Sequence, residues 1–136
     1  MSTHSKLEAA KRQLDRAIKL FFDEADYYSA ITLAGASEEI LGKMLEARGE
    51  THALTSISST ITEILSANDV PTLTNRELIR QLNDVRDWLK HYRDGKDLDF
   101  DAKEAALQLI DRAVSNYFQL TGGESNEMVR FKSQQE

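Results

Sequence analysis

The side chains that could carry out chemistry gather in one stretch, which reads LNDVRDWLKHY. Within it, Arg86, Asp87 and His91 bring a guanidinium, a carboxylate and an imidazole into six residues. An imidazole titrates near neutral pH and can move a proton, while a guanidinium binds a phosphate through its planar fork. Asn83 and Lys90 add an amide and a second cation. These residue types are suited to binding or cleaving a phosphodiester.

A helix through this stretch would place Asn83, Asp87 and Lys90 on a polar face between Arg86 and His91. At 100° and 1.5 Å per residue, Arg86 and His91 lie about 140° apart around the axis and about 7.5 Å apart along it. Both therefore cannot point into the core of one bundle. They can converge on a ligand that lies along the helix, or across a two-fold axis where two copies meet. Asp87, four residues before His91, can orient and charge the imidazole.

The elements that must position these residues are helices. The only proline is Pro71, and apolar residues recur at steps of three and four, which predicts an all-α, four- to five-helix up-and-down bundle. Residues 1–122 form the single domain, and residues 123–136 are predicted to be a polar, mobile tail. The predicted helices span residues 5–22, 23–48, 52–67, 74–94 and 99–120, and the last of them starts at Asp99 or Asp101.

The helix over residues 23–48 is predicted to be central, because it is apolar around much of its circumference. Gly35 and Gly42 lie one heptad apart in it, and each costs about 0.5–1 kcal/mol relative to alanine, so we expect them to admit a close neighbour. Glu38 is expected to meet a base from the first or fourth helix. Trp88 is either a core residue or the anchor of a dimer interface. The fourth helix has an apolar stripe of Leu78, Leu82, Val85, Leu89 and Tyr92.

Composition narrows the function classes. The 136 residues carry a formal charge of −6, which disfavours sequence-independent coating of nucleic acid, although residues 6–22 and 76–93 are locally basic. The chain has no cysteine, which excludes disulfides and thiolate metal sites and favours a reducing compartment. We find neither a signal-peptide pattern nor an apolar run that could span a bilayer, so we expect a soluble, cytoplasmic protein with no membrane partner.

The segment Arg86-Asp87-Trp88-Leu89-Lys90-His91 resembles the R-x4-6-H motif of the HEPN superfamily, and residues 30–39 resemble its central helix. The resemblance covers about residues 5–120. It implies a small all-α bundle, often dimeric, with the motif in a late helix. Active members of the superfamily are metal-independent endoribonucleases, often toxins, and other members are non-catalytic binding domains.

Carried over to this chain, the resemblance implies that His91 is the general acid or base for attack by a ribose 2′-hydroxyl. Arg86 would hold the scissile phosphate, Asp87 would orient His91, and the product would be a 2′,3′-cyclic phosphate. No metal or cofactor is implied. The implied partners are a second copy of the chain, RNA or a nucleotide, and an antitoxin-type protein. The candidate binding residues beside the catalytic ones are Asn83, Lys90 and Tyr92.

Two other interpretations stay open. The polar face can be a solvated surface in which Asp87 pairs with His91, and the protein is then a non-catalytic binding or assembly module. Glu38 and Glu39 can be read with His91 or Asp87 as a metal site, but the Glu-x-x-His spacing of di-iron bundles is absent. Basic surfaces that join around His91 would favour a phosphate site, whereas an Arg86 paired with Glu38 would favour the binding module.

Overall fold

The computed structural model describes residues 1–50 and 75–134. Between residues 75 and 82 it describes the helix, but Arg80 is the only residue whose side chain it describes. The predicted helix over residues 52–67 lies outside the described residues, as do the side chains of Leu78 and Leu82. The described residues form helices and no β-strand, which confirms an all-α helical bundle. None of the described helices combines the length and the apolar character needed to cross a bilayer.

Helix α1 spans Lys6–Lys19 and begins where the Ser5 hydroxyl accepts the Glu8 amide at 3.0 Å. Its predicted apolar stripe is the buried face, with Ala10, Leu14, Ala17 and Ile18 fully covered. A π-helical turn, η1 (Leu20–Glu24), continues it. The predicted start of the next helix at Asp23 is wrong, because Ala25 adopts a left-handed conformation (φ 52°) that ends η1. Asp26 then caps the next helix through the Ser29 amide.

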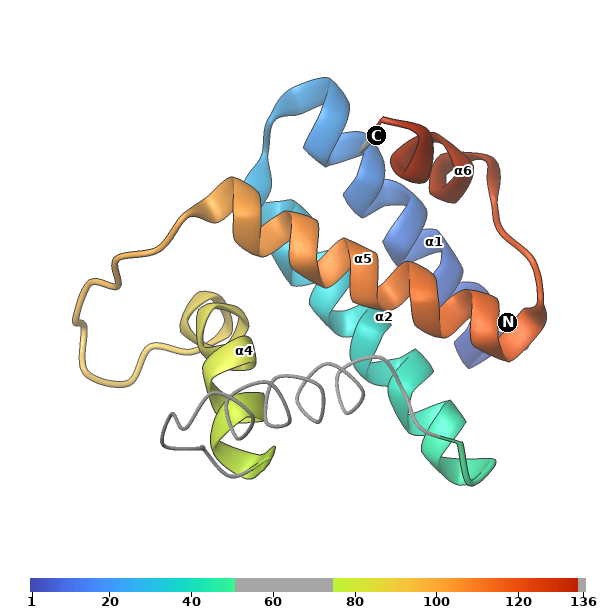
Figure 1. Ribbon diagram of the computed structural model, residues 1–136, viewed down its shortest axis with the longest axis horizontal. Helices are drawn as coiled ribbons and strands as arrows, with labels where there is room; N and C mark the ends of the chain where they lie inside the picture. Colours follow the sequence, from blue (N-terminus) through green and yellow to red (C-terminus); the bar gives the residue numbers. More distant parts are fainter. Residues whose placement is uncertain (51–74, 135–136) are drawn as a thin grey trace, which may run out of the picture.

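Helix α2 (Tyr27–Ala47) is the central element, as predicted. Helices α1 and α5 both run alongside it (Figure 1), and it buries residues on more than one side, including Ile31, Leu41 and the polar Ser37. The Ser37 hydroxyl donates to the Ala10 carbonyl at 2.8 Å, which satisfies a buried polar group between α1 and α2. The helix ends at the predicted stop, where Gly49 has a positive φ of 76°.

Helix α5 (Ala102–Thr121) completes the three-helix core. The Asp101 carboxylate accepts the Glu104 amide at 2.9 Å to cap its start, and Gly122 ends it in the left-handed conformation. Asp101 is one of the two predicted starts of this helix, and the predicted end at residue 120 is one residue short of Thr121. The side chains that α1, η1, α2 and α5 bury together include Leu14, Ile18, Phe21, Ala30, Ile31, Ala34, Leu109, Ile110, Ala113 and Val114.

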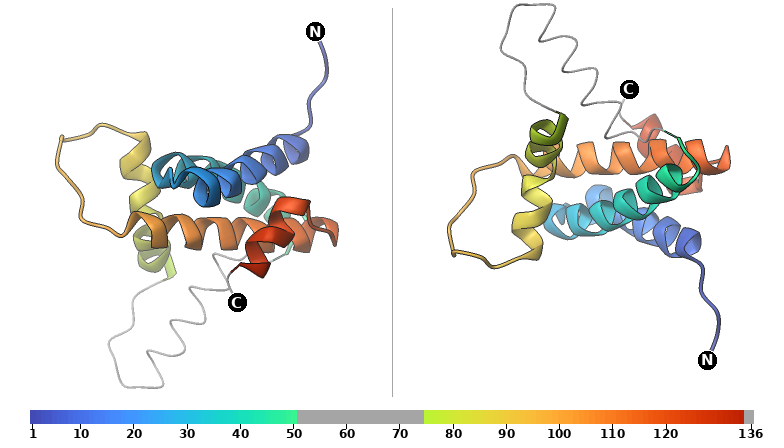
Figure 2. Two further views of the ribbon diagram at one scale, coloured as in Figure 1. Left: turned by 90° about the horizontal axis from the view of Figure 1, so that it is seen from above. Right: turned by 90° about the horizontal axis from the view of Figure 1, so that it is seen from below.

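Helix α4 (Asn75–Lys90) carries the motif and crosses the α2–α5 pair steeply near one end of the bundle (Figure 2). Val85 and Leu89 pack against the core, as their place in the apolar stripe predicts. The helix ends at Lys90 rather than near Asp94. Beyond it the chain folds back toward α4, where the Trp88 indole donates a hydrogen bond to the Lys96 carbonyl at 2.9 Å. Tyr92, predicted to belong to the apolar stripe, therefore lies beyond the helix and is 90% exposed.

The predicted mobile tail over residues 123–136 contains an ordered helix, α6 (Asn126–Ser133). It begins at Ser125, whose hydroxyl accepts the Met128 amide and also contacts Asp15 of α1. Met128 and Phe131, three residues apart on one face, are completely buried in the shared core. The three-residue spacing of these two large apolar side chains was the sequence feature that indicated a helix here. A helix this short is stabilised mainly by burial of its apolar face against the rest of the protein.

The ion pair between Arg130 of α6 and Asp23 of η1 predicts a pH-dependent stability. Hydrogen bonds from the Arg130 guanidinium hold the pKa of the Asp23 carboxyl below its ordinary value. A carboxyl with a lowered folded-state pKa contributes stability above its unfolded pKa of about 3.9 and loses it as the pH falls through the folded-state value.

We therefore expect Arg130→Met to lower the urea midpoint at pH 6–7 and to approach the wild-type midpoint as the pH falls below about 4. Urea titrations at several pH values test this. In an Asp23→Asn background the same substitution should lose this pH dependence. A difference in urea midpoint between wild type and Arg130→Met that stays constant down to low pH would contradict the stabilising ion pair between Arg130 and Asp23.

Candidate functional site

The structure places the side chain of Arg86 between α4 and α2, where it is largely buried rather than exposed. Its aliphatic stem lies against the backbone of α2 at Gly35, where an added Cβ would stand 2.5 Å from Cδ and 2.8 Å from Cγ of the arginine. No side chain larger than hydrogen fits at position 35 without moving Arg86. The predicted close approach at this glycine is therefore confirmed, and the neighbour that needs it is an arginine side chain.

Arg86 is held by carboxylates of α2. Its Nη1 lies 3.4 Å from Oε2 of Glu38 and 3.8 Å from Oε2 of Glu39. The side chains of Arg86 and Glu38 are only 13% and 4% exposed, so this is a buried ion pair. Asp87 adds a distant contact, 3.9 Å from Nε of Arg86. The expectation that Glu38 meets a base from the first or fourth helix is confirmed, and the base is the motif arginine.

A second buried cation, Arg112 of α5, shares this cluster and was not singled out from the sequence. It is 2% exposed, and its Nε and one terminal nitrogen make no hydrogen bond. Burial lowers the pKa of Arg112, Glu38 opposes this shift, and the nearby Arg86 adds to it. Asn116, one turn later, donates to the Glu38 carbonyl at 3.5 Å. The sequence feature that could have revealed Arg112 is its position between Leu109 and Ala113 on the buried face of α5.

Asn83 also faces inward, so the prediction that it lies on the exposed polar face is wrong. It is buried, and its side-chain oxygen has no hydrogen-bond partner. Asn83 lies three residues before Arg86, and residues three apart on a helix share a face. The side of α4 that carries Arg86 toward α2 therefore carries Asn83 inward as well.

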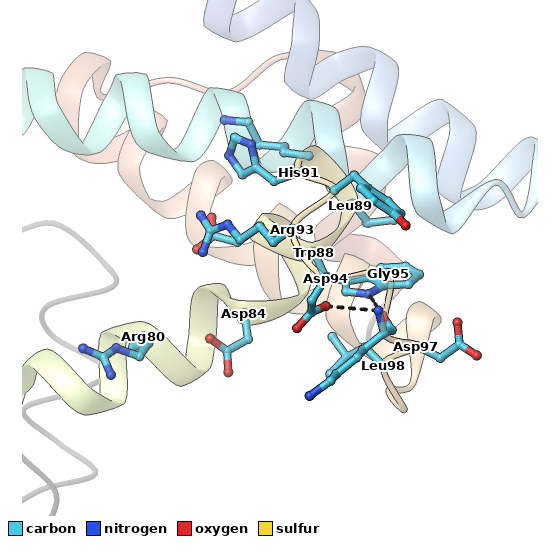
Figure 3. A pocket seen from close by; sticks show the side chains of 14 residues that line it. Arg80, Asp84, Trp88, Leu89, His91, Arg93, Asp94, Gly95, Asp97 and Leu98 are labelled. Atoms are coloured by element: carbon cyan, nitrogen blue, oxygen red, sulfur yellow. Dashed lines mark hydrogen bonds between the residues drawn. The ribbon is translucent and has the colours of Figure 1, made fainter.

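His91 occupies a different surface. It follows the last residue of α4, is exposed, and lines an open cleft of about 850 Å³ between α4 and the loop after it (Figure 3). Asp87, Lys90 and Tyr92 line the same cleft. Four of the six predicted site residues are thus brought together there. The full lining is Arg80, Asp84, Asp87, Trp88, Leu89, Lys90, His91, Tyr92, Arg93, Asp94, Gly95, Lys96, Asp97 and Leu98.

The two residues left out of this cleft are Arg86 and Asn83. Arg86 points to Glu38 while His91 lies in the cleft, so a single chain does not present both to one phosphate. The basic residues of α1 do not line the cleft either; Arg12 and Arg16 instead pair with Glu8 and Glu24. Between the side chains of Asp87 and His91, the described part of the chain shows neither a hydrogen bond nor an ion pair.

A metal site was the remaining interpretation of Glu38 and Glu39. Among residues 1–50 and 75–134, no group of three or more histidine, aspartate and glutamate side chains is arranged to hold a metal ion. Glu38 faces Arg86 instead, so its carboxylate is used in an ion pair with a guanidinium.

Comparisons of this chain with protein-family models, with curated proteins and with solved structures gave no match.

Proposed function

We propose that this chain is a non-catalytic helical module of HEPN-like architecture that binds a protein through the cleft and the loop after α4. The observation that carries the proposal is the burial of Arg86 against Glu38 and Gly35, outside the lining of the cleft. The absence of cysteine supports a reducing cytoplasm as its location. The proposal includes no membrane partner, metal or cofactor.

The burial of Arg86 weighs against catalysis for a chemical reason. Cleavage by a ribose 2′-hydroxyl needs a proton-transfer group and a cation that offsets charge on the same phosphate. Here the guanidinium already faces the Glu38 carboxylate and is 13% exposed. Releasing it to a substrate would leave Glu38 buried with one cation fewer, and uncompensated buried charge is costly.

A metal-independent endoribonuclease remains a second candidate, with His91 and Arg86 as its catalytic pair. The observation that favours it is that His91, Asp87 and Lys90 line one open cleft of about 850 Å³. In this candidate Arg86 must come from a second copy of the chain or leave Glu38 when RNA binds. An antitoxin-type protein would then be the partner that blocks the cleft.

RNA cleavage in EDTA separates the two candidates. Purified wild type is expected to leave several RNAs intact and to produce no 2′,3′-cyclic-phosphate ends. The variants are His91→Ala, Arg86→Ala and, as a matched control, His4→Ala, which replaces an exposed histidine outside the cleft. Cyclic-phosphate ends that vanish in His91→Ala and Arg86→Ala, but persist in His4→Ala, would replace the binding module with the endoribonuclease.

A further inference from the structure

Arg112 of α5 is a buried guanidinium with an unused binding edge. The residue is 2% exposed, and its Nε and Nη2 atoms are covered and make no hydrogen bond. These two nitrogens form one edge of the planar guanidinium, and arginine frequently binds an anion through two parallel N–H bonds. Buried polar groups are almost always hydrogen-bonded. The unused edge therefore indicates an acceptor that the described side chains do not supply.

The charges around Arg112 are not balanced among the described residues. Burial lowers the pKa of Arg112, the Glu38 carboxylate opposes this shift, and the nearby Arg86 adds to it. Oε2 of Glu38 lies 3.4 Å from Nη1 of Arg86, so two guanidinium groups share one buried carboxylate. The carboxylates of Glu39 and Asp87 near Arg86 are 43% and 45% exposed. One interior cation therefore has no buried counter-charge of its own.

Arg86 of α4 has an unused nitrogen as well. Its Nε is covered and makes no hydrogen bond. Unused N–H groups thus come from two helices, and both of the guanidinium groups that carry them act on the same carboxylate, Glu38. A water molecule could accept these hydrogen bonds but would leave the excess positive charge in place. An anion supplies both an acceptor and the missing negative charge.

We infer that Arg112 and Arg86 form an interior binding site for a single inorganic anion of the size and charge of chloride. The free edge of Arg112 holds the ion through two N–H bonds, and the charge of Arg86 adds to the attraction. A bulky ligand is excluded, because Arg112 is almost fully enclosed. Neither arginine lines the cleft, so this site is separate from the proposed protein-binding function.

An anion on Arg112 would strengthen the attachment of α4 to α2. Arg86 joins the two helices through Glu38, and Arg112 attracts the same carboxylate. Once the anion neutralises Arg112, the Glu38 carboxylate is left to Arg86. The ion therefore stabilises the helix that carries the cleft without touching the cleft itself.

Urea unfolding in mixtures of sodium chloride and sodium gluconate tests the inference on the full chain. Urea brings no chloride, and the bulkier gluconate ion holds the ionic strength constant while chloride rises from about 1 mM to about 300 mM. A ligand that binds only the folded chain lowers the unfolding equilibrium constant in proportion to its concentration above the dissociation constant. For one ion per chain, we expect a fall of about tenfold for each tenfold rise in chloride.

Arg112→Met removes the charge and the free edge while it keeps a long apolar stem. Its unfolding equilibrium constant should not respond when chloride replaces gluconate. Arg16→Met is the matched control, because Arg16 is 57% exposed and pairs with Glu24. It should keep the chloride response of the wild type. Circular dichroism checks that each variant is folded. A wild type without a chloride response, or an equal response in Arg112→Met, would overturn the inference.

Bromide supplies a second readout that does not depend on stability or on any variant. It is a heavier halide, and its anomalous X-ray scattering distinguishes it from water. Wild-type crystals grown in sodium bromide should show one anomalous peak in contact with Nε and Nη2 of Arg112. Density without an anomalous signal at this position would identify a water molecule and overturn the anion, as would the lack of any density there.

Discussion

Replacing Glu38 with glutamine is expected to lower the free energy of unfolding by about 3–5 kcal/mol. The glutamine keeps the shape of the side chain and removes only its charge. Two guanidinium groups, those of Arg86 and Arg112, lie around this carboxylate in the bundle interior. Without this charge both cations stay in the interior and lose their buried counter-charge, and only the more exposed carboxylates of Glu39 and Asp87 remain near Arg86. A buried charge that loses its buried partner costs far more than an exposed one.

Glu39→Gln is the matched control for this prediction. Its carboxylate lies on the same helix and approaches the same Arg86 nitrogen, at 3.8 Å, but its side chain is 43% exposed. Solvent screening should limit its effect to about 1 kcal/mol or less. Urea unfolding followed by circular dichroism measures both variants through the midpoint at constant slope. Equal effects of the two substitutions would mean that Arg86 is not buried against Glu38.

Adding one methyl group at position 35 is expected to destabilise the protein by about 1–2 kcal/mol. The methyl of Gly35→Ala would overlap the stem of Arg86, and overpacking of this kind costs about 1–3 kcal/mol. Alanine is the better helix former by about 0.5–1 kcal/mol, which offsets part of the cost. Because α4 must shift to make room, the fluorescence of Trp88 should change at the same time.

The sign of this effect should reverse when the arginine is removed. In an Arg86→Ala background the two close atoms are gone, and only the Cβ of residue 86 remains, at an ordinary contact distance of 3.9 Å. Gly35→Ala should then raise the free energy of unfolding by about 0.5–1 kcal/mol. The four proteins form a double-mutant cycle, and its coupling energy measures the contact between positions 35 and 86 directly. If Gly35→Ala has the same effect in both backgrounds, Arg86 does not lie over Gly35.

Much of the fold follows from local patterns that can be read along the chain. Helices α1, α2 and α5 have an apolar face repeated every three or four residues, and capping residues such as Ser5 and Asp101 begin them. The role of Gly35 could also be predicted from the sequence. A glycine inside a helix is destabilising, so its presence indicates that a neighbouring group lies too close for a larger side chain. Asp87, Lys90, His91 and Tyr92 could be grouped from the sequence because they are neighbours in it, and the structure places all four on the lining of one cleft.

What only the tertiary structure decided is which way α4 turns its polar residues. The spacing of apolar residues in α4 places Arg86 beside the apolar stripe, but it does not show whether a carboxylate of a neighbouring helix lies close enough to pair with it. That acid is Glu38, 48 positions earlier, and Arg112 joins it from α5. Charge pairing in the interior depends on distances between helices, so no spacing within one helix can reveal it. Helix geometry alone separates Arg86 from His91, but only the packed bundle decides that Arg86 is buried and that His91 lines the cleft.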